Sequence, residues 1–354
     1  MRPTRGALLA LCSCVVGGAL ALAGAVWAVG SDIFTSTHAG FLNLAGGAWL
    51  ETQPGLLHPL PLPPGVVLNL GERLSDGWVV AGTQPAPVAR ELFILSSKGG
   101  ALSELAVPSR RPQDAALLRQ EAVPLVAAGR LAGLVWLEGD SPRSLAVRTA
   151  SWDGTRWSEP HTVSSPGPGS QLALTAARLA DGSWLLAWSA YDGHADAVVW
   201  SRGQGDRWSL PEPIGPSLGV PNITPDLVGT ADGALAAWSR LEGDGYRVVV
   251  ARFAEGRWLP PVAIGGLGSV YPHFVSQQAQ KSRLLYRTAG PAGWVLAELD
   301  AQGHPGRTAQ ALAQMHPNQP DERSRPTIEE QPAGIRFRWP ASGHVVDVAW
   351  TSPR

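Results

Sequence analysis

The chain has 354 residues, of which 44% are hydrophobic and 16% are charged, and its formal net charge is −1. This composition supports a sizeable core, excludes a disordered chain, and lacks the positive charge of a nucleic-acid-binding domain. Both cysteines, Cys12 and Cys14, lie near the N-terminus, so the body of the chain can form no disulfide and do no thiol chemistry.

The N-terminal segment predicts export. Arg2 and Arg5 precede an uncharged run over residues 6–30, and positive charge before an apolar stretch directs the rest of the chain out of the cytoplasm. The run is long enough to span a membrane, yet small residues near its end also suit a signal-peptide cleavage site. Two alternatives stay open, a cleaved signal peptide over residues 1–30 and an apolar helix that anchors the chain through residues 6–30. A lipoprotein site at Cys14 is a weaker third. The body is expected in the periplasm, outside the cell, or anchored to the membrane outside the cytoplasm.

A repeat of about 50 residues runs through the body of the chain, and a fixed period of this length indicates a propeller or a solenoid. Two tryptophans recur in three successive units. The first ends an apolar stretch and the second follows an arginine; they are Trp136, Trp188 and Trp238, and Trp157, Trp208 and Trp258. Each unit contains four short β-rich segments separated by turns, which is typical of a propeller blade. The inner strand of several blades is expected to begin at a proline, as at Pro124, Pro225 and Pro272.

The pattern extends to an all-β propeller of six four-stranded blades over residues 66–354. The blades are expected at about 66–110, 123–166, 171–217, 224–268, 271–313 and 326–354. The last blade supplies only three strands, and Gly-Ala-Trp at 47–49 is similar to Gly-Arg-Trp at 256–258 in an outer strand. We therefore expect residues 45–54 to pair with the last blade and close the ring, because this would remove an open sheet edge. Residues 31–65 then form this closing strand and a Pro-rich connector, and residues 109–122 form a connector with a short helical turn.

The turn before the fourth strand carries a motif. It reads Ser-Trp-Asp-Gly-Thr-Arg-Trp at 151–157 and Ser-Arg-Gly-Gln-Gly-Asp-Arg-Trp at 201–208. These segments resemble the Asp-box (BNR) repeat of sialidase-like six-bladed propellers, Ser/Thr-x-Asp-x-Gly-x-x-Trp. The first box is one residue short between Asp153 and Gly154, and the second has Gly203 in place of Asp. In that family the box is a folding element remote from the active face.

The resemblance also implies a catalytic set, which this chain does not reproduce. Sialidases hold the substrate carboxylate with three arginines and use a tyrosine nucleophile with an acidic partner. Their Arg-Ile-Pro signature is absent, and Ser-Arg-Pro ending at Pro326 is the nearest match. Tyr286 is a weak nucleophile candidate, because it occupies the position of the repeated tryptophan and is better explained by core packing.

Ligands of propellers usually bind at the mouth of the central channel, near the starts of the inner strands. The polar residues expected there are Gln171, Asn222, Asp226, Tyr271, His273, Arg325, Glu329 and Glu330. Asp226 and His273 each follow a proline in neighbouring blades, so they are expected side by side, where they could do acid–base work. Polar groups that merely line a wet channel are the plainer interpretation. The candidate catalytic residues are Asp226, Glu329, Glu330 and Tyr286, and the candidate ligand-binding residues are Asn222, Asp226, Tyr271, His273 and Arg325.

Metal and cofactor signals are weak. Asp192, Asp196, Glu242 and Asp244 alternate with glycine in two equivalent loops and could hold Ca²⁺, but turns favour Asp and Gly in any case. No zinc-like histidine pairing is present, and we expect no cofactor.

The sequence therefore predicts an exported sialidase-like propeller that binds a glycan or a protein of the cell envelope and lacks the sialidase catalytic set. One alternative is a glycoside hydrolase that uses Asp226 with Glu329 or Glu330, about 5–9 Å apart. Another is a membrane-anchored scaffold subunit.

Overall fold

The computed structural model describes most of the chain after residue 40. The ranges are 41–44, 47–53, 56–87, 89–99, 101–110, 116–167, 169–215, 219–278, 281–288, 293–312, 326–339 and 343–351. They contain strands and turns, and no helix in them is long and apolar enough to cross a membrane. The N-terminal segment, for which we expected a signal or anchor helix, and Arg325 lie outside the described residues.

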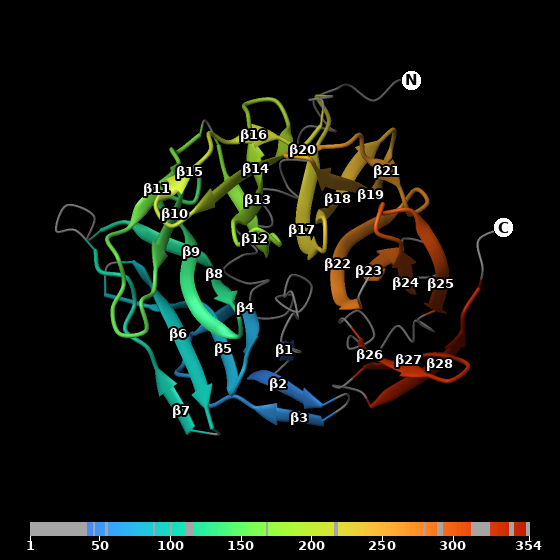
Figure 1. Ribbon diagram of the computed structural model, residues 1–354, viewed down its shortest axis with the longest axis horizontal. Coiled ribbons are helices and arrows are strands. Elements are labelled where there is room, and N and C mark those ends of the chain that lie inside the picture. Colours follow the sequence, from blue (N-terminus) through green and yellow to red (C-terminus); the bar gives the residue numbers. More distant parts are fainter. Residues whose placement is uncertain are drawn as a thin grey trace, which may run out of the picture.

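The described chain is all-β, and its antiparallel sheets follow one another around a ring in chain order (Figure 1). The first sheet contains β1 (Phe41–Leu44), β2 (Gly47–Gln53) and β3 (Leu56–Pro59). The second contains β4 (Val67–Leu74), β5 (Gly77–Pro85), β6 (Arg90–Lys98) and β7 (Ala101–Glu104). The third contains β8 (Leu118–Ala127), β9 (Arg130–Ser141), β10 (Ser144–Ser151) and β11 (His161–Ser164).

The remaining sheets repeat this arrangement. The fourth contains β12 (Gln171–Arg178), β13 (Trp184–Tyr191), β14 (Asp196–Gln204), β15 (Arg207–Trp208) and β16 (Glu212–Pro213). The fifth contains β17 (Asn222–Thr230), β18 (Gly233–Glu242), β19 (Gly245–Ala254), β20 (Arg257–Trp258) and β21 (Val262–Ala263). The sixth contains β22 (Ser269–Gln278), β23 (Lys281–Thr288), β24 (Gly293–Leu299) and β25 (Pro305–Leu312). The seventh contains β26 (Thr327–Gln331), β27 (Gly334–Trp339) and β28 (His344–Ala349).

The predicted all-β architecture is confirmed, and several of its antiparallel sheets have four strands, consistent with a propeller, whereas the closure of six blades by an N-terminal strand is not confirmed. Seven sheets are formed by the described residues, and β2 pairs with β1 on one edge and with β3 on the other. Both edges of β2 are therefore occupied, and none is left for β28. Local hairpin partners win because closing a short loop costs less entropy than joining the two ends of the chain. The supposed Pro-rich connector contributes β3 to this sheet.

The first strand of each later sheet lies nearest the centre of the ring (Figure 1), and four of these strands contain the same β-bulge. The register shifts after Gln120, Leu172, Ile223 and Val270, and the next residue in each case has a left-handed backbone. These residues are Glu121 (φ 47°), Ala173 (φ 56°), Thr224 (φ 54°) and Tyr271 (φ 55°). Bulges of this kind bend a strand and redirect its side chains.

The bulges correct two expectations. The inner strands β17 and β22 begin three residues before Pro225 and Pro272, at Asn222 and Ser269. A proline is tolerated inside these strands because it lies in the bulge, where the ladder needs no N–H. Likewise β8 begins at Leu118 and takes in the end of the segment that we expected to be a connector.

The repeated aromatic position holds neighbouring sheets together. Trp136, Trp188, Trp238, Tyr286 and Trp339 are each at most 5% exposed. Each packs on apolar side chains of the preceding sheet, for example Trp238 on Leu185, Ala187 and Val198. Burying such a side chain contributes about 2–3 kcal/mol, so the recurring tryptophan is a structural feature, as its spacing indicates.

The Asp-box-like segment forms a tight turn. Asp153 accepts hydrogen bonds from the backbone N–H groups of Thr155 and Arg156, 2.8 and 2.9 Å away. These bonds hold the pKa of Asp153 below its usual range. The motif therefore stabilises the connection between the third and fourth strands of its sheet.

Candidate functional site

Two of the predicted site residues meet on neighbouring inner strands. Asp226 lies on β17 directly after the bulge, and His273 lies at the equivalent position of β22. His273 Nδ1 is 2.9 Å from Asp226 Oδ2, and the two residues are 9% and 4% exposed. A buried carboxylate beside an imidazole orients the ring and fixes which nitrogen carries the proton.

The Asp226 carboxylate is heavily used by the protein. Its Oδ1 accepts hydrogen bonds from Thr175 Oγ1 on β12, at 3.1 Å, and from the backbone N–H of Leu227, at 3.0 Å. Its Oδ2 accepts one from the backbone N–H of Phe274 on β22, at 2.8 Å. Asp226 thus joins the three consecutive inner strands β12, β17 and β22. The carboxylate that was a catalytic candidate therefore has a structural role.

Glu121, in the bulge of the inner strand β8, is a residue that the sequence analysis missed. Its carboxylate accepts a hydrogen bond from the backbone N–H of Leu174 on the neighbouring β12, at 2.9 Å. Burial raises the pKa of Glu121 to about 7, and the hydrogen bonds from Leu174 and Ala173 offset only part of this effect. Its spacing from the repeated aromatic residue could have identified it. Glu121 lies 15 residues before Trp136, as Ala173 does before Trp188 and Tyr271 before Tyr286.

The bulges form a series of caps between neighbouring inner strands. Asn69, in the bulge of β4, accepts from the backbone N–H of Ala122 at 3.2 Å, and Glu121 accepts from Leu174. In the next two sheets the residue at the position of Ala122 and Leu174 is Pro225 or Pro272, which has no N–H to cap. The facing bulge residues there are Ala173 and Thr224. A side-chain acceptor is thus present in the two bulges, those of Asn69 and Glu121, that face a residue with a free backbone N–H.

Asn222 and Tyr271, two predicted ligand-binding residues, also have protein partners. Asn222 Oδ1 accepts from Trp238 Nε1 at 2.8 Å, and its Nδ2 donates to the carbonyl of Val220 at 2.7 Å. The backbone N–H of Tyr271 donates to Ser239 Oγ at 3.0 Å. Gln171 is buried and donates to the carbonyl of Leu145.

The other catalytic candidates lie apart from Asp226 in the sheet order. Glu329 and Glu330 are on β26; Glu330 pairs with Arg283 at 2.9 Å, and Glu329 lies 3.9 Å from Arg336. Tyr286 is 5% exposed, and burial raises its pKa to about 12. A buried, protonated phenol in the repeated aromatic position suits packing better than nucleophilic attack.

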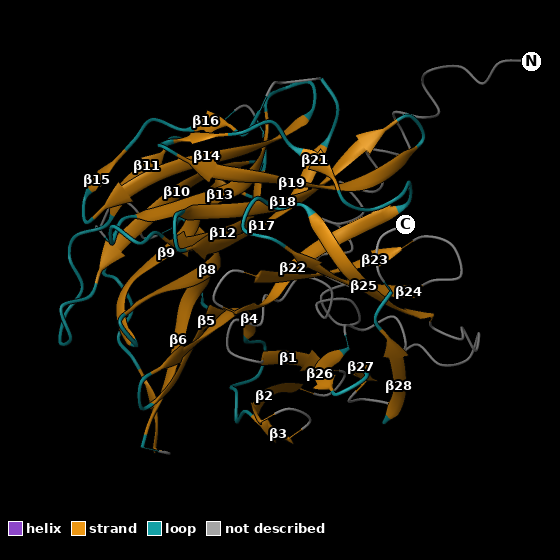
Figure 2. Ribbon diagram, turned by 45° about the vertical axis from the view of Figure 1, so that its right-hand side comes forward, coloured by secondary structure: helices purple, strands orange, loops and turns teal. Residues whose placement is uncertain are grey.

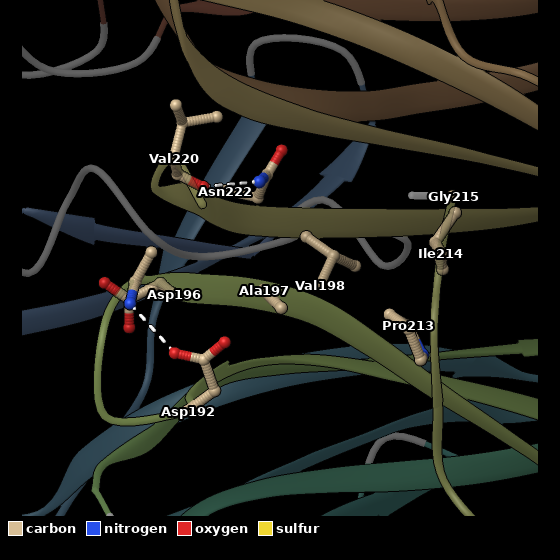
Figure 3. Close-up of a pocket in the computed structure, with 10 residues that line it drawn as sticks. Asp192, Asp196, Ala197, Val198, Pro213, Ile214, Gly215, Val220 and Asn222 are labelled. Carbon is tan, nitrogen blue, oxygen red and sulfur yellow. Dashed lines mark hydrogen bonds between the residues drawn. The ribbon is translucent and has the colours of Figure 1, made fainter. Parts of the chain in front are cut away.

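A small pocket opens beside the start of β17 (Figure 3). It is a shallow hollow with room inside its walls of about 10 Å³, enough for one water molecule, and it opens directly to solvent. Asp192, in the turn between β13 and β14, and Asp196, the first residue of β14, lie on one side of it, and Val220 and Asn222 lie on the other. Pro213, Ile214 and Gly215 supply its apolar end.

The two carboxylates of the pocket differ. Asp192 Oδ1 accepts from the backbone N–H groups of His194 and Ala195, at 2.8 and 2.9 Å, and these bonds lower its pKa. Within the part of the chain that the structure describes, Asp196 is half-buried and its carboxylate makes no hydrogen bond or ion pair. Burial and the negative charge of Asp192 raise the pKa of Asp196. Asp196 therefore lines the pocket with carboxylate oxygens that have no protein donor among the described residues and are open to solvent.

Neither acidic loop assembles a metal site from side chains alone. Among the described residues, no three or more His, Cys, Asp or Glu side chains are grouped so as to hold a metal ion. In the second loop the Glu242 carboxylate is engaged by Arg240 and Arg247. What the pocket offers is carboxylate oxygens at the protein surface, which can accept hydrogen bonds from hydroxyl groups.

Comparisons with known proteins identify the fold and no family. No family model matches the sequence, and no curated protein matches it either. Among solved structures, an ulvan lyase of polysaccharide lyase family PL25, bound to -[GlcA(1-4)Rha3S]-, aligns over 91% of this chain and 94% of its own, with 9% identity and a TM-score of 0.53. A GH43 endo-arabinanase from Bacillus licheniformis aligns over 68% of this chain and 95% of its own, with 14% identity and a TM-score of 0.41. At such identities the likeness concerns the fold alone.

Proposed function

We propose that this chain is an exported, sialidase-like β-propeller that binds a glycan on the face where its inner strands begin. The observation that carries the proposal is the Asp196 carboxylate, which is half-buried, lacks a protein donor among the described residues, and faces a pocket shared with Asp192 and Asn222. A sugar hydroxyl that enters the pocket can replace water as the hydrogen-bond donor to this carboxylate.

The hydrogen bonds of Asp226 support binding over catalysis. A glycosidase needs one carboxylic acid and one carboxylate that reach the substrate. Asp226 instead accepts hydrogen bonds from Thr175, Leu227 and Phe274, and so is committed to joining inner strands. The PL25 ulvan lyase, which shares the fold at a TM-score of 0.53, makes a carbohydrate ligand a reasonable first choice.

The test is a glycan array probed with the full chain, followed by calorimetric titration of each hit. Asp196→Ala is expected to weaken binding at least about tenfold, which corresponds to roughly 1.4 kcal/mol. Asp206→Ala is the matched control, because Asp206 is an exposed aspartate in the turn after β14, at the opposite end of the strand that begins with Asp196. Either silence of a folded chain across the array or full binding by Asp196→Ala would contradict the proposal.

A second candidate function is acid–base catalysis in the channel. It is favoured by the 2.9 Å contact between His273 Nδ1 and Asp226 Oδ2, because such a pair can set up an imidazole as a general base. The test is turnover of a panel of fluorogenic glycosides, including a sialoside, by the wild type and by His273→Gln. Turnover that this variant abolishes while its melting temperature is retained would make the chain an enzyme.

Export and envelope location rest on the sequence of residues 1–30. Fractionation of cells that express the full chain, with N-terminal sequencing of the product, distinguishes a cleaved signal peptide from a retained anchor. A protein partner or a scaffold role becomes the working alternative if no glycan binds.

A further inference from the structure

An exposed tyrosine stands beside the pocket of Asp192 and Asp196. Tyr191 is the last residue of β13 and lies directly opposite Asp196, the first residue of β14, in the strand register. Directly opposite residues of an antiparallel pair place their side chains on the same face of the sheet, with Cβ atoms about 4.5–5.5 Å apart. The Tyr191 ring is therefore a close neighbour of the carboxylate that carries the proposed function.

The face that Tyr191 shares with Asp196 points towards the fifth sheet. Ser189 lies two residues before Tyr191, on the same face of β13, and its Oγ donates to the carbonyl of Asn222 on β17 at 3.1 Å. Val198 lies two residues after Asp196, packs in an apolar cluster with side chains of the fifth sheet, and also lines the pocket. Tyr191 thus lies on the pocket side of its sheet.

The backbone holds the Tyr191 ring in place while part of the ring stays open to solvent. Its Oη donates to the carbonyl of Gly193 at 3.0 Å. The backbone at Gly169 lies so close to the ring that a Cβ added there would be 2.4 Å from Tyr191 Cδ1. Tyr191 is nevertheless 37% exposed, whereas the repeated aromatic residue Trp188, three positions earlier, is 1% exposed. A ring that is already fixed loses little conformational freedom when a ligand binds to it.

The hollow and the ring together suit one sugar unit. The hollow holds about one water molecule, so a ligand lies across its mouth rather than inside it. A pyranose carries hydroxyl groups around its rim and C–H groups on its two faces. An aromatic ring removes the apolar C–H face from water, and the Asp196 carboxylate accepts a hydrogen bond from a hydroxyl on the rim.

We propose that Tyr191 is the stacking platform of this site and makes it select a neutral pyranose. This assignment rests on the proposed function and adds to it the residue that selects the sugar. The pyranose lies with one C–H face on the Tyr191 ring and directs a hydroxyl to Asp196. Because the hollow opens directly to solvent, an internal unit of a polysaccharide fits as well as a terminal one.

The test is calorimetric titration of the full chain with neutral β-1,4-linked hexasaccharides of glucose, xylose, mannose and galactose, and with α-1,5-arabinohexaose as the furanose comparator. We expect at least one pyranose ligand to bind more tightly than arabinohexaose. Tyr191→Ala should weaken that binding at least about tenfold, whereas Tyr191→Phe keeps the ring and should stay within about threefold of wild type. Leu210→Ala is the matched control, because Leu210 is an exposed apolar side chain between β15 and β16 of the same sheet.

Gly169→Ala is a second variant, which leaves Tyr191 in the chain and displaces its ring. It should also weaken binding of the pyranose ligand, with a melting temperature close to that of wild type. Unchanged binding by Tyr191→Ala, beside a loss of binding by Asp196→Ala, would overturn the platform and leave glycan binding intact. Glycan-array hits confined to furanose or anionic ligands would do the same. Silence of the folded wild type towards every glycan would overturn the proposed function and the platform together.

Discussion

The Glu121 carboxylate on β8 accepts a hydrogen bond from the backbone N–H of Leu174 on β12, 2.9 Å away. It ties one inner strand to the next through the unpaired residues of two bulges. The same arrangement joins Asn69 to Ala122 one sheet earlier. The bulges therefore do two jobs, since they bend the inner strands and supply the contacts between them.

Replacing Glu121 changes how stability depends on pH. Its pKa of about 7 lies above the ordinary 4.5, so the folded state binds the proton more tightly than the unfolded state. Stability from this group is present below about pH 4.5 and is lost as the pH rises through 7. Glu121→Gln should therefore gain about 1–3 kcal/mol over wild type between pH 4.5 and pH 8. Urea denaturation at several pH values measures the difference, with the exposed Glu159→Gln as control, and a difference independent of pH would count against it.

Pro225 has no backbone N–H to donate, and Ala173, the bulge residue that faces it, has no side-chain acceptor. Pro225→Ala introduces a buried backbone N–H that faces no cap and should cost about 1–3 kcal/mol. Adding Ala173→Asn supplies an amide oxygen at a residue whose φ of 56° suits asparagine. A double-mutant cycle should give a favourable coupling of at least about 0.5 kcal/mol. Strict additivity would show that this N–H does not face residue 173.

Asp226 is expected to matter for stability more than for binding. Asp226→Ala leaves the N–H groups of Leu227 and Phe274 without their acceptor, inside the protein. The cost should be about 2–4 kcal/mol in the free energy of unfolding. Thr175→Val removes only one of these bonds and should cost about 1 kcal/mol. Chemical denaturation of both variants tests this order, and an Asp226→Ala variant as stable as wild type would contradict it.

Substitutions of Tyr286 distinguish a packing role of this side chain from a catalytic role. Tyr286→Phe keeps the ring between the fifth and sixth sheets and should change stability by less than about 1.5 kcal/mol, whereas Tyr286→Ala should cost about 3–5 kcal/mol. Both are measured by thermal or urea unfolding. If the wild type turns over a glycoside and Tyr286→Phe is folded but inactive, the tyrosine is a nucleophile after all.

The pocket should prefer neutral glycans to anionic ones. Asp192 and Asp196 line it, and none of its described lining residues is Lys or Arg. A uronate or sulfate would meet one or two negative charges within a screening length of about 8–10 Å. Titration with neutral and uronate-containing oligosaccharides of equal length should show the preference, and Asp192→Asn together with Asp196→Asn should remove it. Tighter binding of the anionic ligand by wild type would refute this selectivity without refuting glycan binding.

The sequence by itself determined the repeating unit. Trp136, Trp188 and Trp238 recur because each sheet must present the same large apolar side chain to its neighbour, and that requirement appears at a fixed spacing. The Asp153 turn was likewise readable, because its hydrogen bonds join residues two and three apart. Hydrogen bonds between residues so close in the chain can be inferred from the sequence.

Only the tertiary structure decided how the ring ends and which polar groups are occupied. Residues 47–53 resemble an outer strand, but β1 and β3 take both of its edges, and a similarity of pattern does not specify a partner. The adjacency of Asp226 and His273 was predicted, yet the bonds from Thr175 and Phe274 that occupy Asp226 join residues about 50 positions away in the chain. Such contacts depend on how the bulged strands pack beside one another, which no local sequence pattern specifies.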